Sequence, residues 1–345
     1  MRFPWGYELA IDLGTANTHI CVKGAGVVVR EPSMIAYDGA GRRPIAVGLE
    51  ARRMLERDVQ GVHVLRPIRG GVVADFDATV AMLRHLLHRA LGRRPLITPR
   101  VIAALPNQAT DVERRALADA LHAAGGGEII VVDKSLAAAL GAGVRVEGDA
   151  TRLVVDLGAG ATSVGLVAMG MATTGTVVRF GGDDLDELIR RNVKRAQGIQ
   201  ISPTSAEQAK LQVGTLLPPE HGSSLRVDGI AGESGTPATA DVALGDVPEM
   251  LVRGLNRPIT EIAWLLEELP PSQRAEVAAN GAVLTGGGAL LGAVDAYLAE
   301  KLGIPVQVAT DPASCTILGL EAMLNEPHAI SLGGRRFRAP GTQGR

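Results

Sequence analysis

The sequence has few aromatic residues, two cysteines and almost no excess of charge of either sign. Only 3% of its 345 residues are aromatic but 46% are hydrophobic, so aliphatic side chains must fill its interior. A net charge of −2 provides no positive field for a polyanion, which argues against nucleic acid as a partner. Cys21 and Cys315 are far apart and form no CxxC motif, which favours a reduced cytoplasmic setting over a disulfide-stapled secreted one.

The sequence also lacks a segment typical of a membrane-spanning helix. Residues 1–6 have no apolar signal-peptide core. Residues 153–178 carry one charge, Asp156, but glycines and the run Thr173-Thr174-Gly175 interrupt them. This pattern predicts paired buried strands rather than a spanning helix.

The length of the chain favours two joined domains over a single core. Short β-branched runs alternate with segments of helical periodicity, which predicts an α/β architecture. The expected strands are residues 9–12, 19–23, 101–105, 129–132, 153–156, 163–169 and 282–284. The expected helices are residues 78–91, 112–124, 184–196, 257–268 and 290–302.

An internal repeat is the most informative pattern. Residues 12–18 read DLGTANT and residues 156–162 read DLGAGAT, each directly after an apolar run. Backbone amides in such turns can bind phosphate oxygens, and the aspartate at the strand end can hold hydrated Mg²⁺. Two ordinary hairpin turns are the alternative, because Asp and Gly are common in turns. The match between the copies favours a duplicated phosphate-binding unit, with a boundary near residue 148.

A third glycine-rich element, TGGGALL at residues 285–291, follows a predicted strand. Three glycines allow the backbone to approach a flat or phosphorylated ligand closely. An ordinary connection between a strand and a helix explains the same residues equally well.

Six motifs follow one another across residues 9–325, and their combination resembles the MreB family of bacterial actin-like, rod shape-determining proteins. The motifs are residues 11–23, Glu31-Pro32-Ser33, the run from Arg66-Pro67 to Phe76, Val112-Glu113-Arg114-Arg115, Gly181-Gly182-Asp183 and the TGGGALL run. The resemblance implies an α/β, actin-like (ribonuclease H-like) duplicated fold with four subdomains and a central nucleotide cleft. We expect a first lobe over residues 1–148, with a small subdomain at 30–75. A second lobe would span residues 149–325, with a small subdomain at 184–248, and a polar tail at 326–345 would fray.

The resemblance also implies a site for ATP and Mg²⁺. Asp12 and Asp156 would act in catalysis by orienting the magnesium ion, largely through its waters. The residues implied to bind the nucleotide are Gly14, Thr15, Ala16 and Asn17 in the first phosphate loop; Gly158, Ala159, Gly160, Ala161 and Thr162 in the second; Glu207, Gln208, Ala209 and Lys210 at the adenosine; and Gly286, Gly287, Gly288 and Ala289 at the base and sugar.

Two departures from the family pattern predict impaired ATP hydrolysis. Lys134 stands where the family has the glutamate that positions the attacking water, and an ammonium cannot accept a proton from water unless its pKa is strongly lowered. Lys134 would instead hold the γ-phosphate. Asp133 is either a substitute polarising group or a surface residue, and we favour the surface residue. The second phosphate loop has also lost polar groups, with Ala159, Ala161 and Ser163 in place of a glycine, a threonine and a glutamate.

A membrane contact is predicted at Leu96 and Ile97, where the resemblance implies a hydrophobic insertion loop. Nearby arginines would attract anionic lipid, and Phe3 and Trp5 offer a second apolar anchor. The arginines are Arg84, Arg89, Arg93 and Arg94. The alternative is that Leu96 and Ile97 enter the following strand and the arginines are solvated.

The resemblance implies an ATP-binding protein that forms filaments at the inner face of the cytoplasmic membrane and serves cell shape and cell-wall morphogenesis. Its implied partners are further copies of itself, the anionic membrane surface and membrane proteins of the cell-wall elongation machinery. One alternative is a pseudo-ATPase scaffold that co-assembles with a paralogue. Another is a small-molecule kinase, although the sequence offers no extra carboxylate base. A chaperone ATPase is disfavoured because no substrate-binding domain follows residue 325.

Overall fold

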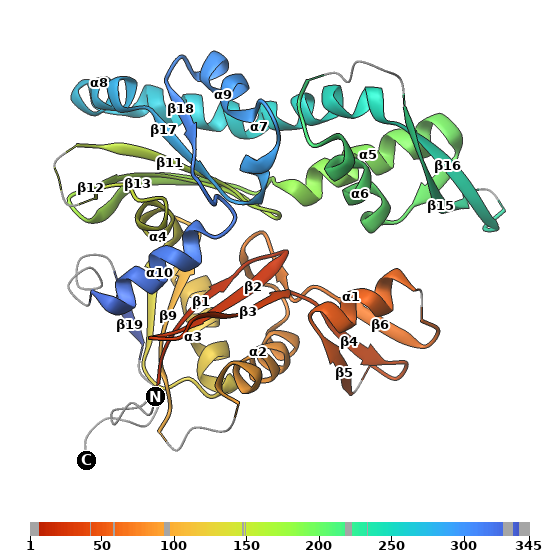
Figure 1. The fold of residues 1–345 in the computed structure, drawn as a ribbon, viewed down its shortest axis with the longest axis horizontal. Coiled ribbons are helices and arrows are strands. Elements are labelled where there is room, and N and C mark those ends of the chain that lie inside the picture. The colour runs from red at the N-terminus through yellow and green to blue at the C-terminus, as the bar shows by residue number, and fades with distance from the viewer. Residues whose placement is uncertain are drawn as a thin grey trace.

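The computed structural model describes residues 7–41, 43–57, 59–92, 97–146, 148, 150–217, 223–232, 234–326 and 334–337. They form two α/β halves, drawn one above the other in Figure 1, each with a large sheet on one side and a small sheet on the other. The helices are α1 (Leu49–Glu56), α2 (Phe76–Leu91), α3 (Asp111–Ala124), α4 (Lys134–Gly141), α5 (Gly182–Gln197), α6 (Pro203–Val213), α7 (Val247–Glu268), α8 (Pro271–Asn280), α9 (Val294–Leu302) and α10 (Cys315–Asn325).

The large sheet of the first half has six strands. Its central strands are buried on both faces, as expected where helices cover a sheet on both sides. The pairs β1–β9 and β9–β10 are parallel and the outer pairs are antiparallel. In spatial order the strands are β19 (Arg335–Phe337), β10 (Ile129–Asp133), β9 (Arg100–Leu105), β1 (Glu8–Leu13), β2 (Asn17–Val22) and β3 (Gly26–Pro32).

The large sheet of the second half repeats this order with five strands. Its antiparallel hairpin β11–β12 is extended by β13, and β11 pairs in parallel with β17, which pairs with β18. In spatial order the strands are β13 (Met171–Val178), β12 (Thr162–Ala168), β11 (Arg152–Leu157), β17 (Ala282–Thr285) and β18 (Val306–Val308).

The internal repeat of the sequence also appears in the register of the hairpins β1–β2 and β11–β12. Asp12 pairs with His19 across β1–β2, and Asp156 pairs with Ser163 across β11–β12. Asp156 follows Asp12, and Ser163 follows His19, by the same number of residues that separates the two sequence copies. The repeat predicted from the sequence therefore corresponds to two equivalent hairpins at equivalent places in two equivalent sheets.

Each half also has a small three-stranded sheet, of order β5-β4-β6 in the first and β14-β15-β16 in the second. These sheets lie within the segments where the two small subdomains are expected, while the exact domain boundaries stay predictions. The remaining strands are β4 (Ile35–Asp38), β5 (Pro44–Val47), β6 (Val62–Leu65), β7 (Ile68–Arg69), β8 (Val72–Val73), β14 (Ile199–Ile201), β15 (Ser224–Ala231) and β16 (Pro237–Ala243).

The seven expected strands all occur, but some helices and the tail differ from the sequence-based expectation. The helix expected at 290–302 begins only at Val294, after a short 3₁₀ turn at Gly287–Leu290. The helix expected at 257–268 is the end of the longer α7, which continues through Pro258. Part of the tail expected to fray, Arg335–Phe337, instead pairs with β10 as β19.

Helices α4 and α10 lie between the two large sheets (Figure 1) and pack against each other. Their buried residues form one hydrophobic cluster with residues from strands of both halves, including Ile102 from β9 and Val154 from β11. The two halves therefore share a core along these helices, and the cleft described below opens beside it.

Candidate functional site

Two hairpin turns, one from each half, face each other across a cleft. A Cβ atom on Gly160 would lie 2.6 Å from Thr15 Oγ1 and 2.8 Å from Gly70 N, so glycine is needed for this close approach. The turn residues that line the cleft are Gly14, Thr15, Ala16, Asn17, Gly158, Ala159, Gly160 and Ala161.

The two turns have the same internal geometry. Gly14 N donates to Asn17 O at 3.0 Å, and Gly158 N donates to Ala161 O at 3.0 Å. A Cβ on either glycine would lie within 2.8 Å of the carbonyl oxygen that its turn bonds. The glycine at the start of each copy is thus required by the turn itself.

The departures in the second turn are accommodated without backbone strain. Ala159 is not among the described non-glycine residues with positive φ, so its side chain is compatible with the turn. Thr162, implied to contact the nucleotide, is buried and its hydroxyl donates to Phe180 O at 2.9 Å. It supports the turn from beneath rather than lining the cleft.

Of the third glycine element, Gly286 and Gly287 line the cleft. Gly286 has φ +83°, and a Cβ there would lie 2.5 Å from Leu157 O. A Cβ on Gly288 would meet Leu157 at 2.8 Å, while the side chain of Ala289 is buried. Close packing against the end of β11 therefore explains Gly286 and Gly288, and Gly287 alone has open space around it.

Three charged side chains meet at the base of the cleft. Lys134 Nζ lies 2.8 Å from Asp156 Oδ2, and Asp156 Oδ1 accepts a hydrogen bond from Thr285 Oγ1 at 3.1 Å. Asp12 also lines the cleft, with its Oδ2 3.8 Å from His19 Nδ1, which is too long for a hydrogen bond. The ammonium of Lys134 thus contacts the carboxylate at the end of β11.

The pKa values of this cluster favour its ionised form. Burial disfavours the charged ammonium of Lys134, but the charges of Asp156 and Asp12 outweigh burial and raise the pKa of Lys134 above its ordinary value. Burial likewise opposes ionisation of Asp12, but the charge of Lys134 and the nearby His19 hold the pKa of Asp12 below its ordinary value. Lys134 therefore cannot serve as the base that accepts a proton from water.

The donor set does not fit the magnesium ion that the resemblance implies. Mg²⁺ requires near-octahedral oxygen ligands, several of them water, but the Lys134 ammonium already lies against Asp156. Within the part of the chain that the structure describes, no group of three or more His, Cys, Asp or Glu residues could hold a metal ion by itself, so an ion in the cleft would depend on Asp12, Asp156, water and the nucleotide.

Asp133, the possible substitute for the water-positioning glutamate, is paired elsewhere. Its Oδ1 accepts from Arg114 Nη2 at 2.7 Å, and it lies at the N-cap position of α4. Ser163 occupies the second-hairpin position opposite Asp156 and is buried at the edge of the cleft. Neither residue supplies a free carboxylate near the cleft.

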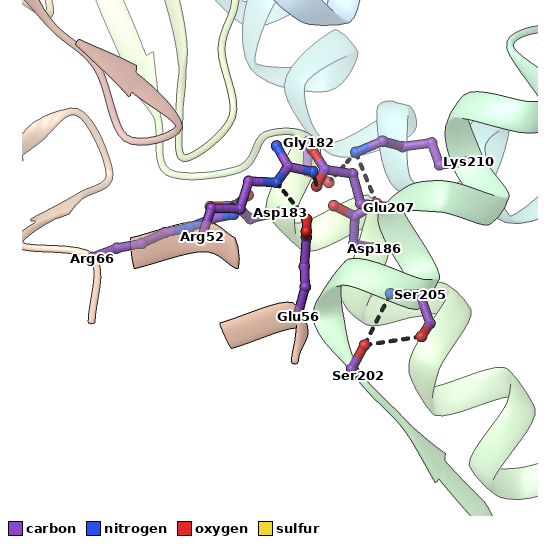
Figure 2. A network of polar contacts seen from close by, with 10 residues as sticks. All are labelled: Arg52, Glu56, Arg66, Gly182, Asp183, Asp186, Ser202, Ser205, Glu207 and Lys210. Atoms are coloured by element: carbon purple, nitrogen blue, oxygen red, sulfur yellow. Dashed lines mark hydrogen bonds and ion pairs between the residues drawn. The ribbon is translucent and has the colours of Figure 1, made fainter. Parts of the chain in front are cut away.

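The residues implied to contact adenosine lie on α6, beside a neighbouring groove. Glu207 accepts from Arg52 Nη2 at 3.3 Å, and Lys210 Nζ donates to Gly182 O at 3.0 Å. Figure 2 shows these side chains in one polar network with Arg66, which donates to Asp183 at 2.8 Å.

The other two adenosine candidates differ in exposure, since Gln208 is exposed and Ala209 is buried. None of the four α6 candidates lines the cleft between the two turns. Lys210 is linked to the second turn through Gly182, whose N donates to Gly158 O at 3.0 Å.

Several residues in or beside the cleft have no role assigned from the sequence. Thr285 is buried beside the cleft and pairs with Asp156 across β11–β17, and His19 faces Asp12 across the first hairpin. Arg30 Nη1 donates to Ser314 Oγ at 3.0 Å, and both side chains line the cleft. Hairpin spacing could have identified His19, because it follows Asp12 across a short turn, and Thr285 begins the TGGGALL run, but Arg30 and Ser314 come from distant segments.

Only some residues of the predicted membrane contact are among those that the structure describes. Leu96, Arg93, Arg94, Phe3 and Trp5 lie outside the described residues.

Ile97 is 56% exposed and β9 begins only at Arg100, so the alternative that Ile97 enters the strand is wrong. Arg84 donates to Ala123 O, and Arg89 pairs with Glu31. Among the described residues, no helix has both the length and the apolar character needed to span a bilayer.

Comparison with known proteins gives consistent matches. The MreB/Mbl protein family model matches residues 6–332. The chain is 35% identical over 318 residues to the cell shape-determining protein Mbl of Bacillus subtilis, covering 92% of this chain and 96% of Mbl. It is 38% identical over 325 residues to the cell shape-determining protein MreB of Escherichia coli, covering 92% and 93%.

Solved structures agree with these matches. MreB5 of Spiroplasma citri bound to ADP superposes with a TM-score of 0.86 at 28% identity, covering 94% of this chain and 98% of MreB5. The same protein bound to AMPPNP gives a TM-score of 0.85. The MamK double helical filament gives 0.76 at 21% identity over 93% of this chain and 99% of MamK, a likeness of fold alone. The predicted α/β, actin-like fold is confirmed.

Proposed function

Because the chain belongs to the MreB/Mbl family of cell shape-determining, actin-like proteins, we propose that it binds ATP between its two lobes and assembles into filaments that serve cell-wall morphogenesis. The observation that carries this proposal is the pair of matched glycine turns, at Gly14–Asn17 and 158–161, that face each other across the cleft. Turns of this kind present backbone amides to phosphate oxygens. The relative MreB5 binds ADP and AMPPNP, which supports a nucleotide in the same place.

ATP hydrolysis by this chain is proposed to be slow. Lys134 is charged and paired with Asp156, and Asp133 is paired with Arg114. Among the described residues that line the cleft, Asp12 and Asp156 are the only carboxylates. A static scaffold that co-assembles with a more active paralogue is therefore the second candidate function. A small-molecule kinase is less well supported, because it needs a further carboxylate to activate its substrate.

We place the filaments at the inner face of the cytoplasmic membrane. The exposed Ile97, which lies between α2 and β9 and follows Leu96 in the sequence, supports an insertion loop. Further copies of the chain and membrane proteins of the cell-wall elongation machinery are the proposed partners.

Sedimentation and thermal melting, with ATP, with ADP and without nucleotide, test the proposal. ATP should raise the melting midpoint, because it binds only the folded state, and should increase the pelleted fraction. The variant Gly287→Val should lose both effects, since its side chain would enter the cleft where an added Cβ meets no atom within 4 Å.

Gly245→Val is the matched control, because Gly245 also has open space but lies outside the cleft. The control should respond to ATP as the wild type does. An unshifted wild-type melt at millimolar ATP, together with no sedimentation in any nucleotide, would refute the proposed function.

A further inference from the structure

We propose that the ammonium of Lys134 takes the place of a divalent cation in the phosphate cleft, so that this chain binds nucleotide without a metal ion. The inference rests on the proposed nucleotide binding but goes beyond it, because the resemblance implies a magnesium site here. The inference is about which cation neutralises the phosphates, and not about which nucleotide binds.

The position of Lys134 supports this inference. Lys134 is the first residue of α4, directly after β10 of the first large sheet. Its Nζ reaches across to Asp156 Oδ2, at the end of β11 in the second sheet, at 2.8 Å. The ion pair therefore joins the two halves at the base of the cleft, where both phosphate turns begin.

The surroundings of the ion pair place it inside the site rather than on the surface. The side chain of Asp156 is 3% exposed and that of Lys134 is 18% exposed. The second oxygen of Asp156 is taken by the hydroxyl of Thr285. Both oxygens of this carboxylate thus have protein partners, and a metal ion or its water would have to compete with them.

Charge and chemistry favour the same conclusion. A divalent cation placed between Asp12 and Asp156 would be repelled by an ammonium already in contact with Asp156. An ammonium has three N–H donors. One donor toward Asp156 leaves the others for phosphate oxygens, and lysine is a common point-charge partner of phosphate. Lys134 can therefore neutralise phosphate charge in the way that a bound metal ion does.

The contacts of α4 keep Lys134 in this position. The following residue, Ser135, is buried, and its hydroxyl donates to Asn107 Oδ1 at 2.9 Å. Asn107 Nδ2 in turn donates to Val164 O in β12 at 2.9 Å. The first turn of α4 is thus fixed to the hairpin that carries the second phosphate turn, which orients Lys134 toward the cleft.

Titration of ATP into the full-length protein, in buffer with EDTA and in buffer with Mg²⁺, tests the inference. The dissociation constants of the wild type in the two buffers should agree within about twofold. In Lys134→Met the affinity in EDTA should fall by about tenfold or more, because the positive charge is lost. Addition of Mg²⁺ should then restore part of that affinity, since Asp156 becomes available to a metal ion.

Lys301→Met is the matched control. Lys301 lies on α9 and pairs with the exposed Glu300, so this variant should behave as the wild type in both buffers. Melting without nucleotide reports whether each variant is folded, and the wild-type comparison decides the question even if Lys134→Met does not fold.

The two results that would contradict the inference have different consequences for the proposed function. Wild-type binding that requires Mg²⁺ and disappears in EDTA would overturn the inference and leave the proposed function intact. Binding in neither buffer would refute the proposed function and this inference with it.

Discussion

Asp186 on α5 is a buried carboxylate that lines the neighbouring groove, with Asp183 and Glu207 nearby (Figure 2). Lys210 Nζ lies 2.8 Å from Asp186 Oδ1 but is not aligned as a hydrogen bond to it. Burial raises the pKa of Asp186 to about 6, with smaller contributions from Glu207 and Asp183, and the charge of Lys210 only partly opposes the rise.

This raised pKa predicts a pH dependence of stability. Since the native pKa of Asp186 lies above the ordinary value of 3.8, the folded state retains a proton that the unfolded state releases. The free energy of unfolding contributed by this group is therefore highest below pH 3.8 and falls as the pH rises through about 6. Asp186→Asn, which stays neutral, should be more stable than the wild type at neutral pH by about 1–3 kcal/mol.

Urea unfolding at acidic and at neutral pH measures this difference. The advantage of Asp186→Asn should vanish at the acidic pH, where the wild-type carboxyl is also protonated. Asp228→Asn, at an exposed position on β15, should not change the profile. A lower stability of Asp186→Asn at neutral pH would show that the pair with Lys210 outweighs the cost of burial.

At the scale of elements, the crossing of α4 and α10 positions the charged cluster. A Cβ on Gly141 would lie 1.8 Å from Cys315 O, and a Cβ on Gly319 would lie 1.7 Å from Ala137 O. Glycine at both positions therefore lets the two backbones touch. Because α4 begins at Lys134, the same contact determines how far Lys134 reaches toward Asp156.

Replacement of these glycines should loosen the crossing. Gly141→Ala and Gly319→Ala should each lower the free energy of unfolding by about 1–3 kcal/mol or more, because the backbones must separate to admit a methyl group. Gly245→Ala is the control, since a Cβ there meets no atom within 4 Å. Urea unfolding of the three variants measures the effect, and unchanged stability of Gly141→Ala and Gly319→Ala would show that the helices can move apart freely.

The elements predicted correctly from the sequence are those with a strong local pattern. β1 and β11 are apolar runs that end at the two copies of the repeat, and they lead into the two turns proposed to bind phosphate. α4 was not predicted because its Ala-rich sequence is buried along most of its length and offers no polar face. β19 was missed because its pairing with β10 joins segments about two hundred residues apart, which no local pattern records.

The residues of the site also fall into those that a local sequence pattern predicts and those that no local pattern predicts. The turn glycines belong to a local repeat and could be read directly from the sequence. The contact of Lys134 with Asp156, and that of Asp156 with Thr285, joins three separate strand ends. Their positions depend on the order of strands in two sheets, so the sequence identified Lys134 as a departure without revealing its partner.

At the scale of the whole molecule, the two halves are joined by the shared core at α4 and α10 and by ion pairs at the opposite side. Arg52 pairs with Glu207 at 3.3 Å, and Arg66 pairs with Asp183 at 2.8 Å. These pairs are partly exposed, so each contributes little stability on its own. They connect α1 and the residue that follows β6, in the first half, to α6 and α5 of the second.

The proposed membrane contact gives a test at this scale. In Leu96→Ser/Ile97→Ser, binding to anionic vesicles should weaken by about tenfold or more, because an aliphatic side chain contributes roughly 1.5–3 kcal/mol when it is buried. Ile97 is 56% exposed, so the fold loses little when it is replaced, and the thermal shift caused by ATP should be unchanged. Flotation with vesicles of anionic lipid measures the bound fraction.

A control for the loss of exposed apolar surface comes from the other half of the molecule. Leu211 and Leu217 are 65% and 60% exposed, so Leu211→Ser/Leu217→Ser also removes exposed aliphatic surface. This control should float with the vesicles as the wild type does. Equal loss of binding by both double variants would show that general hydrophobicity directs the protein to lipid. Unfolding of Leu96→Ser/Ile97→Ser would assign the pair to the core, and the loop between α2 and β9 would no longer be the proposed anchor.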